Sequence, residues 1–116
     1  MQELVIYHNP QCSKSRKALE LLHEKGLKPI VVDYLKSPLN FKQLKALSSH
    51  FPFHEFIRTD DAVFQELYLS LDDKNTVLKS LINHPQLMQR PIVTYKGNAV
   101  IGRPPEKILA LFNVYL

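Results

Sequence analysis

Hydrophobic residues recur along this chain with two different periods, and each change of period marks a new element. An apolar run predicts a strand over Glu3–Tyr7, and apolar residues three and four apart predict a helix from about Ser13 to Lys25. Gly26 is placed to end that helix, and the β-branched run Pro29–Tyr34 predicts a second strand. Strand, helix and strand in this order indicate a βαβ unit with parallel strands.

The middle of the chain has helical periodicity, and we interpret residues 40–84, approximately, as a helical insertion. Its expected parts are a helix over Phe41–Ser48 capped by Asn40, a loop or short turn over His50–Glu55, a helix opened by Arg58–Asp61, and a helix over about Asn75–Asn83. The helix opened by Arg58–Asp61 is expected to be capped by Thr59 or Asp60 and to bury Val63, Phe64, Leu67 and Tyr68.

The last third of the chain predicts a hairpin and a closing helix. The apolar runs Ile92–Tyr95 and Ala99–Gly102 flank a turn that contains Gly97, which is typical of antiparallel strands. Arg103-Pro104-Pro105 is expected to start the final helix, since proline is tolerated in a first turn. The order β-α-β, helical insertion, β-β-α predicts an α/β fold with a mixed four-stranded sheet, in a single domain over residues 1–116.

Composition narrows the class of protein. The chain has 116 residues and one cysteine, so an internal disulfide framework is excluded. With no signal peptide and no apolar run of membrane-spanning length, we expect a cytoplasmic protein without a membrane partner. The net charge of +4 comes from scattered cations, and we expect no nucleic-acid partner.

The lone cysteine, Cys12, falls where the first strand gives way to the first helix. Free N–H groups and a partial positive charge at a helix N-terminus stabilise a thiolate, which is the nucleophilic form of cysteine. Lys14 and Arg16 add positive charge within a turn, and His8 would add more if protonated. The sequence therefore predicts a reactive thiolate with a lowered pKa.

Other chemistries fit the sequence poorly. A tyrosine-phosphatase loop needs an arginine six residues after the cysteine, and that position is Ala18. The histidines have no metal-ligand spacing with a second cysteine, so we predict no metal site, and no Gly-rich phosphate loop is present.

The element order and the Cys12–Ser15 pair, a monothiol version of the C-x-x-C motif, resemble a thioredoxin-like fold. In that fold a cis-proline lies opposite the cysteine, so Pro91 is expected to follow a cis bond. The resemblance extends to one family. The motif at 7–16, Arg58, the run Arg90–Val93 and the run Gly102–Glu106 together resemble the glutaredoxin-coupled arsenate reductases, related to the Spx-type proteins.

This resemblance implies roles for individual residues. Cys12 would attack arsenate or a similar oxyanion, with His8 helping to lower its pKa, and three arginines would hold the oxyanion: Arg58, Arg90 and Arg103. Asn9 would hold the loop and Pro91 would support the cysteine, while Ser15 would either bond the thiolate or be an ordinary first-turn residue. Glutathione would be the reductant and glutaredoxin the protein partner, with no bound cofactor.

The chain departs from the best-known family members in two respects. Ser13-Lys14 stands where they have Gly-Thr, and no long tail follows the last helix, so the chain resembles a shorter branch. Two alternatives stay open. One is a monothiol oxidoreductase that acts on glutathione mixed disulfides, and the other is an Spx-like regulator, although Ser15 replaces the partner thiol of its C-x-x-C switch.

Overall fold

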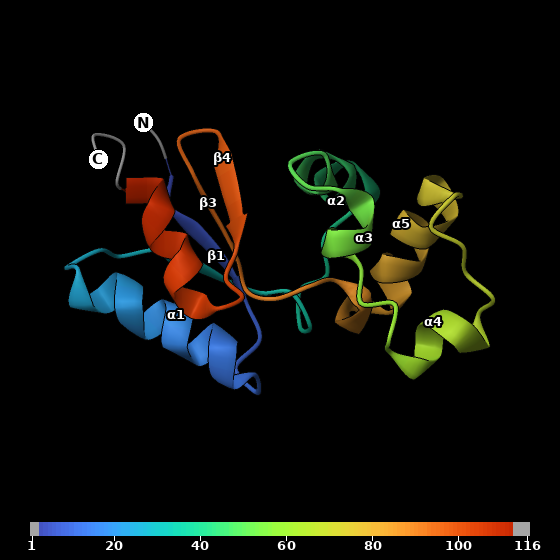
Figure 1. Cartoon of the computed structure of the whole chain (residues 1–116), viewed down its shortest axis with the longest axis horizontal. Coiled ribbons are helices and arrows are strands. Elements are labelled where there is room, and N and C mark those ends of the chain that lie inside the picture. The colour runs from blue at the N-terminus through green and yellow to red at the C-terminus, as the bar shows by residue number, and fades with distance from the viewer. Residues whose placement is uncertain (1–2, 113–116) are drawn as a thin grey trace. The chain divides into compact units, whose positions relative to one another are not determined.

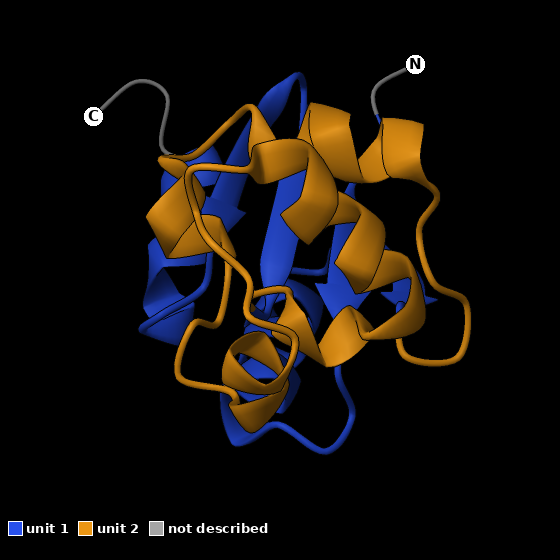
Figure 2. Cartoon of the chain, turned by 90° about the vertical axis from the view of Figure 1, so that its right-hand side faces the viewer, with its two compact units in different colours: residues 1–34, 90–116 blue, residues 35–89 orange. Residues whose placement is uncertain are grey.

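The computed structural model describes residues 3–112, and the chain divides into two compact units (Figure 2). Unit 1 comprises residues 1–34 and 90–116, and unit 2 comprises residues 35–89. The helical insertion expected over about 40–84 falls inside unit 2. That both units form a single domain stays a prediction.

Unit 1 holds one mixed four-stranded sheet, as predicted (Figure 1). Its strands are β1 (Val5–His8), β2 (Ile30–Asp33), β3 (Ile92–Tyr95) and β4 (Asn98–Ile101), in the spatial order β2-β1-β3-β4. β1 pairs in parallel with β2 and antiparallel with β3, and β3 pairs antiparallel with β4. The parallel pair is the predicted βαβ unit, and the last pair is the predicted hairpin.

One face of this sheet is covered by α1 (Ser13–Glu24) and by η2 (Pro105–Phe112), which pack against each other (Figure 1). Ile6 of β1 and Val93 of β3 face each other in register. The buried cluster between sheet and helices consists of Ile6, Ala18, Leu22, Val93 and Ile108. Because side chains alternate along a strand, His8 lies on the same face as Ile6, under the start of α1.

α1 ends as the sequence predicts. Gly26 has φ of +76°, which favours glycine. Its N–H donates to the carbonyl of His23, and the N–H of Leu27 donates to that of Leu22. This pair of bonds is a Schellman motif, and it turns the chain toward β2.

The closing helix differs from the expected one. It is a 3-10 helix that begins at Pro105, and the Arg103–Pro104 bond before it is cis. The tight turn expected at 96–98 is present, with left-handed backbone at Lys96 and Gly97. This closing helix faces the core, since Ile108 is fully buried and Leu109, Leu111 and Phe112 pack against the cluster.

Unit 2 is helical, with α2 (Phe41–Ser48), α3 (Phe53–Phe56), α4 (Ala62–Glu66), α5 (Lys74–Asn83) and the 3-10 turn η1 (Pro85–Leu87). α2 has the predicted bounds, and Asn40 caps it in a reciprocal capping box with Gln43. The stretch expected to be a loop contains the one-turn helix α3.

Two predictions about α4 are wrong. Its cap is Asp61, because the helix begins one residue later than expected and only the Asp61 side chain reaches the N–H of Val63. None of the four apolar residues is buried: Val63 and Phe64 are partly exposed, and Leu67 and Tyr68 are exposed. The helix ends at Glu66, and Tyr68 has φ of +54° with its side chain 93% exposed.

Candidate functional site

Cys12 stands at the N-cap position of α1, where the strand-to-helix turn was predicted to place it. Its N–H donates to the carbonyl of Asn9, and its own carbonyl accepts the N–H of Arg16, each at 3.0 Å. The thiol is free and partly exposed. This position leaves the sulfur beside the unpaired N–H groups of the first helical turn.

The prediction that the Cys12 thiol has a lowered pKa is confirmed. Partial burial acts to raise this pKa, but the backbone N–H of Ser15, the guanidinium of Arg90 and the backbone N–H of Lys14 together outweigh it. The source of the charge differs from the expected one. The cation that acts on the sulfur is Arg90, from the distant segment that precedes β3, whereas Lys14 contributes its backbone N–H.

Arg16 has a different contact from the one expected of it. Its Nη1 donates to the carbonyl of Pro10 at 2.9 Å, so the side chain closes the loop ahead of Cys12. The sequence correctly placed a cation here, but the spacing alone does not tell whether it faces the sulfur or the loop carbonyl.

Arg90 is held by a cis peptide bond and by a hydrogen bond to its carbonyl. The Arg90–Pro91 bond is cis, as predicted from the resemblance. The Nη1 of Arg103 donates to the carbonyl of Arg90 at 3.1 Å. Among the described residues, the buried Nε of Arg90 has no hydrogen-bond partner. A guanidinium beside a thiol whose pKa is lowered is suited to a tetrahedral oxyanion.

Gly102 makes room for Pro91. A Cβ on Gly102 would lie 2.9 Å from Cγ of Pro91 and 3.1 Å from Cγ2 of Ile108. The N–H of Gly102 also donates to the carbonyl of Pro91 at 2.9 Å. The position next to Arg103 is therefore small because proline and helix pack against it, a requirement that the sequence analysis missed.

His8, Asn9 and Ser15 form a hydrogen-bonded group beneath the loop. Nδ1 of His8 lies 2.6 Å from Oγ of Ser15, and the N–H of Asn9 donates to the same Oγ at 2.9 Å. The Asn9 side chain accepts the N–H of Gln11. The Ser15 hydroxyl thus binds His8 and Asn9, while its backbone N–H helps to lower the pKa of Cys12.

The charge expected of His8 is not favoured by its surroundings. His8 is 7% exposed, and burial lowers its pKa, with Asp33 opposing this effect and Arg16 adding to it. A lowered pKa favours neutral imidazole at pH 7. The contact with Ser15 indicates that His8 positions the loop, and its role in the reaction stays a prediction.

Arg58 belongs to unit 2. The segment that carries it pairs with the segment before Arg90: the N–H of Arg58 donates to the carbonyl of Leu87 at 2.7 Å, and Ile57 forms a bridge with Met88. Its Nη1 donates to the carbonyl of Gln86 at 3.3 Å and lies 3.6 Å from Oδ2 of Asp61. Arg90 and Arg103 are grouped with Cys12 in unit 1, and the convergence of all three arginines stays a prediction.

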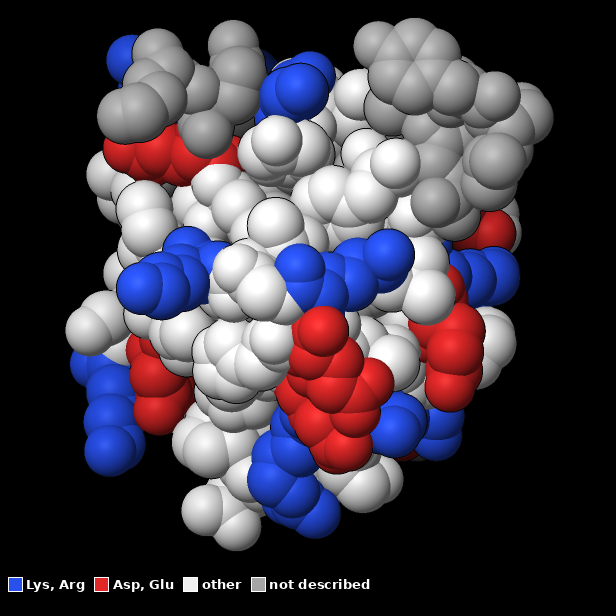
Figure 3. All heavy atoms as spheres, turned by 90° about the vertical axis from the view of Figure 1, so that its left-hand side faces the viewer, with Lys and Arg blue, Asp and Glu red and all other residues white. Residues whose placement is uncertain are grey.

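Charge and metal-ligand groups add little to the site. One face of the molecule carries positive and negative side chains interspersed (Figure 3). Within residues 3–112, no three His, Cys, Asp or Glu side chains form a group that could hold a metal ion. No helix in the same range is long and apolar enough to cross a membrane.

A cysteine with a lowered pKa at a helix N-terminus, together with a cis-proline that precedes a strand of a mixed four-stranded sheet, defines a thioredoxin-like thiol protein. The chain belongs to the ArsC family, whose model matches residues 7–111. The family prediction is confirmed.

Similar proteins match along nearly their whole length. An arsenate reductase of Neisseria meningitidis is 40% identical, and the match covers 96% of this chain and 99% of the relative. An arsenate reductase of Haemophilus influenzae is 37% identical, with 93% and 97% covered. The solved structure of an arsenate reductase from Vibrio cholerae is 36% identical, has a TM-score of 0.87, and is matched over 98% of its length and 95% of this chain.

Proposed function

We propose that this protein is an arsenate reductase that uses the Cys12 thiolate as its nucleophile. The observation that supports it is the lowered pKa of Cys12 beside Arg90, whose Nε has no partner among the described residues. The similarity to arsenate reductases over nearly the full chain supports the same substrate. The enzyme is then an oxidoreductase.

In the proposed reaction the Cys12 sulfur attacks the arsenic of arsenate, and one arsenate oxygen leaves as water. Arg90, Arg103 and Arg58 neutralise the charge on the remaining oxygens. A glutathione thiol then attacks the adduct. Over the full cycle two external thiols become one disulfide, their electron pair reduces arsenic from the V to the III state, and arsenite and the Cys12 thiolate are released.

The chain cannot close this cycle alone because it has one cysteine. The second thiol must come from outside, and we propose glutathione as the reductant and glutaredoxin as the protein that removes the resulting disulfide. Such a cycle needs a reducing compartment, which favours the cytoplasm.

The test is a coupled assay with arsenate, glutathione, glutaredoxin, glutathione reductase and NADPH. We expect arsenate-dependent NADPH oxidation with the wild type and none with Cys12→Ser, whose circular dichroism should be unchanged. Residual turnover by a folded Cys12→Ser protein would remove Cys12 as the nucleophile.

A second outcome of the same assay separates the alternative function. If the wild type ignores arsenate but reduces a glutathionylated peptide, the protein is a monothiol oxidoreductase. Because Cys12 is the sole cysteine, mass spectrometry of the intact protein then shows directly which adduct forms on it.

A further inference from the structure

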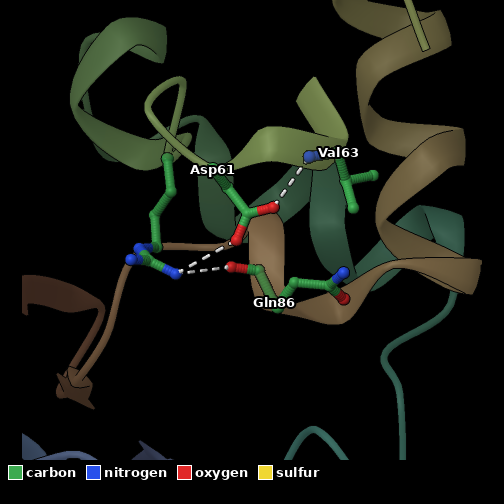
Figure 4. Close-up of polar contacts among 4 residues, drawn as sticks. Asp61, Val63 and Gln86 are labelled. Carbon is green, nitrogen blue, oxygen red and sulfur yellow. Dashed lines mark hydrogen bonds and ion pairs between the residues drawn. The ribbon is translucent and has the colours of Figure 1, made fainter. Parts of the chain in front are cut away.

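The two carboxylate oxygens of Asp61 have different partners, one on each side of it in the sequence. Its Oδ1 accepts the N–H of Val63 at 3.0 Å and so caps α4 (Figure 4). Its Oδ2 lies 3.6 Å from Nη1 of Arg58. The cap fixes the carboxylate on a helix end, and the carboxylate in turn faces the guanidinium.

Among residues 3–112, the side-chain contacts of Arg58 are made through Nη1. Its Nη1 is shared between Oδ2 of Asp61 and the carbonyl of Gln86 (Figure 4). The side chains of Arg58 and Asp61 are 23% and 21% exposed, so the pair is less screened by water than an ordinary surface ion pair. Nε and Nη2, the other donors of the fork, are the ones that an oxyanion would take.

We propose that Asp61 is a positioning residue that pre-orients Arg58 for the oxyanion, an inference that rests on the proposed function of Arg58. A free arginine side chain samples many rotamers and must lose that freedom when it binds an anion. Asp61 and the Gln86 carbonyl restrict the guanidinium before the anion arrives. Asp61 acts through Arg58 alone, and it affects the binding of the oxyanion more than the chemical step at Cys12.

The variant that tests this is Asp61→Asn, measured in the full-length protein. Asparagine is as good an N-cap as aspartate, so the bond to Val63 and the helix are retained while the charge is lost. We expect the KM for arsenate to rise roughly fivefold, with kcat changed by less than about twofold, because a partly exposed ion pair contributes only modestly to holding Arg58 in place.

A matched control is Asp73→Asn. Asp73 caps α5 in the same unit through the N–H of Thr76, so this variant makes the same chemical change at a helix cap away from Arg58. It should leave KM unchanged. In an Arg58→Ala background, Asp61→Asn should have no further effect, because the residue through which it acts is gone.

Several results would overturn the proposal. A lower KM in Asp61→Asn would mean that the carboxylate only opposes the anion. If Asp61→Asn raises KM equally in the Arg58→Ala background, Asp61 acts through another residue.

Calorimetric titration with inorganic arsenate separates this inference from the proposed function. A roughly fivefold weaker Kd in Asp61→Asn without any turnover keeps the positioning role and removes the reductase. Normal turnover with unchanged KM and Kd in Asp61→Asn removes the positioning role and keeps the reductase. A wild type that binds no arsenate overturns both the positioning role and the proposed function.

Discussion

The two units are built from different kinds of contact. In unit 1, residues from the two ends of the chain lie together: Ile6 faces Val93, and Arg90 acts on the sulfur of Cys12. In unit 2, three helices are each capped by a side chain no more than three residues from its partner: Asn40, Asp61 and Asp73. The reactive thiol thus depends on contacts between distant segments, while the starts of these three helices in unit 2 depend on local ones.

The largest expected effect tests the distant contact at the thiol. Arg90→Gln removes the cation that acts on Cys12, so the thiol pKa should rise and kcat/KM for arsenate should fall about 100-fold. Because the thiolate is the reactive form, alkylation by iodoacetamide at pH 7 should slow, and its pH profile should move to higher pH.

Arg16→Gln is the matched control for that variant. It removes a charge that is near Cys12 in sequence, unlike Arg90, and whose Nη1 is bonded to the Pro10 carbonyl. Its alkylation profile should move less than that of Arg90→Gln. An equal or larger shift would show that nearby charge, as inferred from the sequence alone, controls the thiol.

This contrast also explains what the sequence could predict. The bounds of α2, the Asn40 cap, the Gly26 stop and the position of Cys12 depend on neighbours within a few residues, and all were predicted correctly. The mixed four-stranded sheet was predicted from the order of the elements, and the cis bond before Pro91 from the resemblance to a thioredoxin-like fold. The cap at Asp61 and the exposure of Tyr68 were not predicted. A shift of one residue at a helix start leaves the hydrophobic pattern almost unchanged.

At the functional site, too, features set by neighbouring residues could be predicted and those set by distant residues could not. A lowered pKa at Cys12 could be predicted from its helix N-terminus, but the bond from Arg90 could not, because nothing local to either residue reports their proximity. The Ser15 hydroxyl was expected either at the thiolate or in an ordinary role. Its bonds to His8 and Asn9 depend on which face of β1 carries His8.

A smaller effect is expected at the close approach beneath Arg103. Gly102→Ala would place a Cβ 2.9 Å from Cγ of Pro91, a buried ring that has little room to move. We expect the free energy of unfolding to fall by about 1–3 kcal/mol, measured by urea denaturation. Because Pro91 adjoins Arg90, slower alkylation of Cys12 should accompany the loss.

Gly26→Ala provides the comparison within the same unit. Gly26 has open space around its Cβ position, and only its φ of +76° disfavours alanine. It should lose about 1 kcal/mol of stability and leave Cys12 alkylation unchanged. Equal effects of both variants on Cys12 would mean that general loss of stability, and not the packing on Pro91, slows the thiol.

The smallest effect is expected in unit 2, at its best-defined local contact. Asn40→Ala removes both halves of the capping box: the side chain that accepts the N–H of Gln43 and the orientation that lets the Gln43 side chain accept the N–H of Asn40. We expect a loss of about 1 kcal/mol in the free energy of unfolding, with faster hydrogen exchange at the first amides of α2. Asn40→Asp should restore most of the lost stability, since aspartate caps equally well.

Cys12 alkylation should be unchanged in both variants, because the cap acts within a few residues of the start of α2. If Asn40→Ala slows alkylation while urea denaturation shows the expected small loss, the stability of the helical unit is coupled to the thiol, and the separation between local and distant contacts fails at that point.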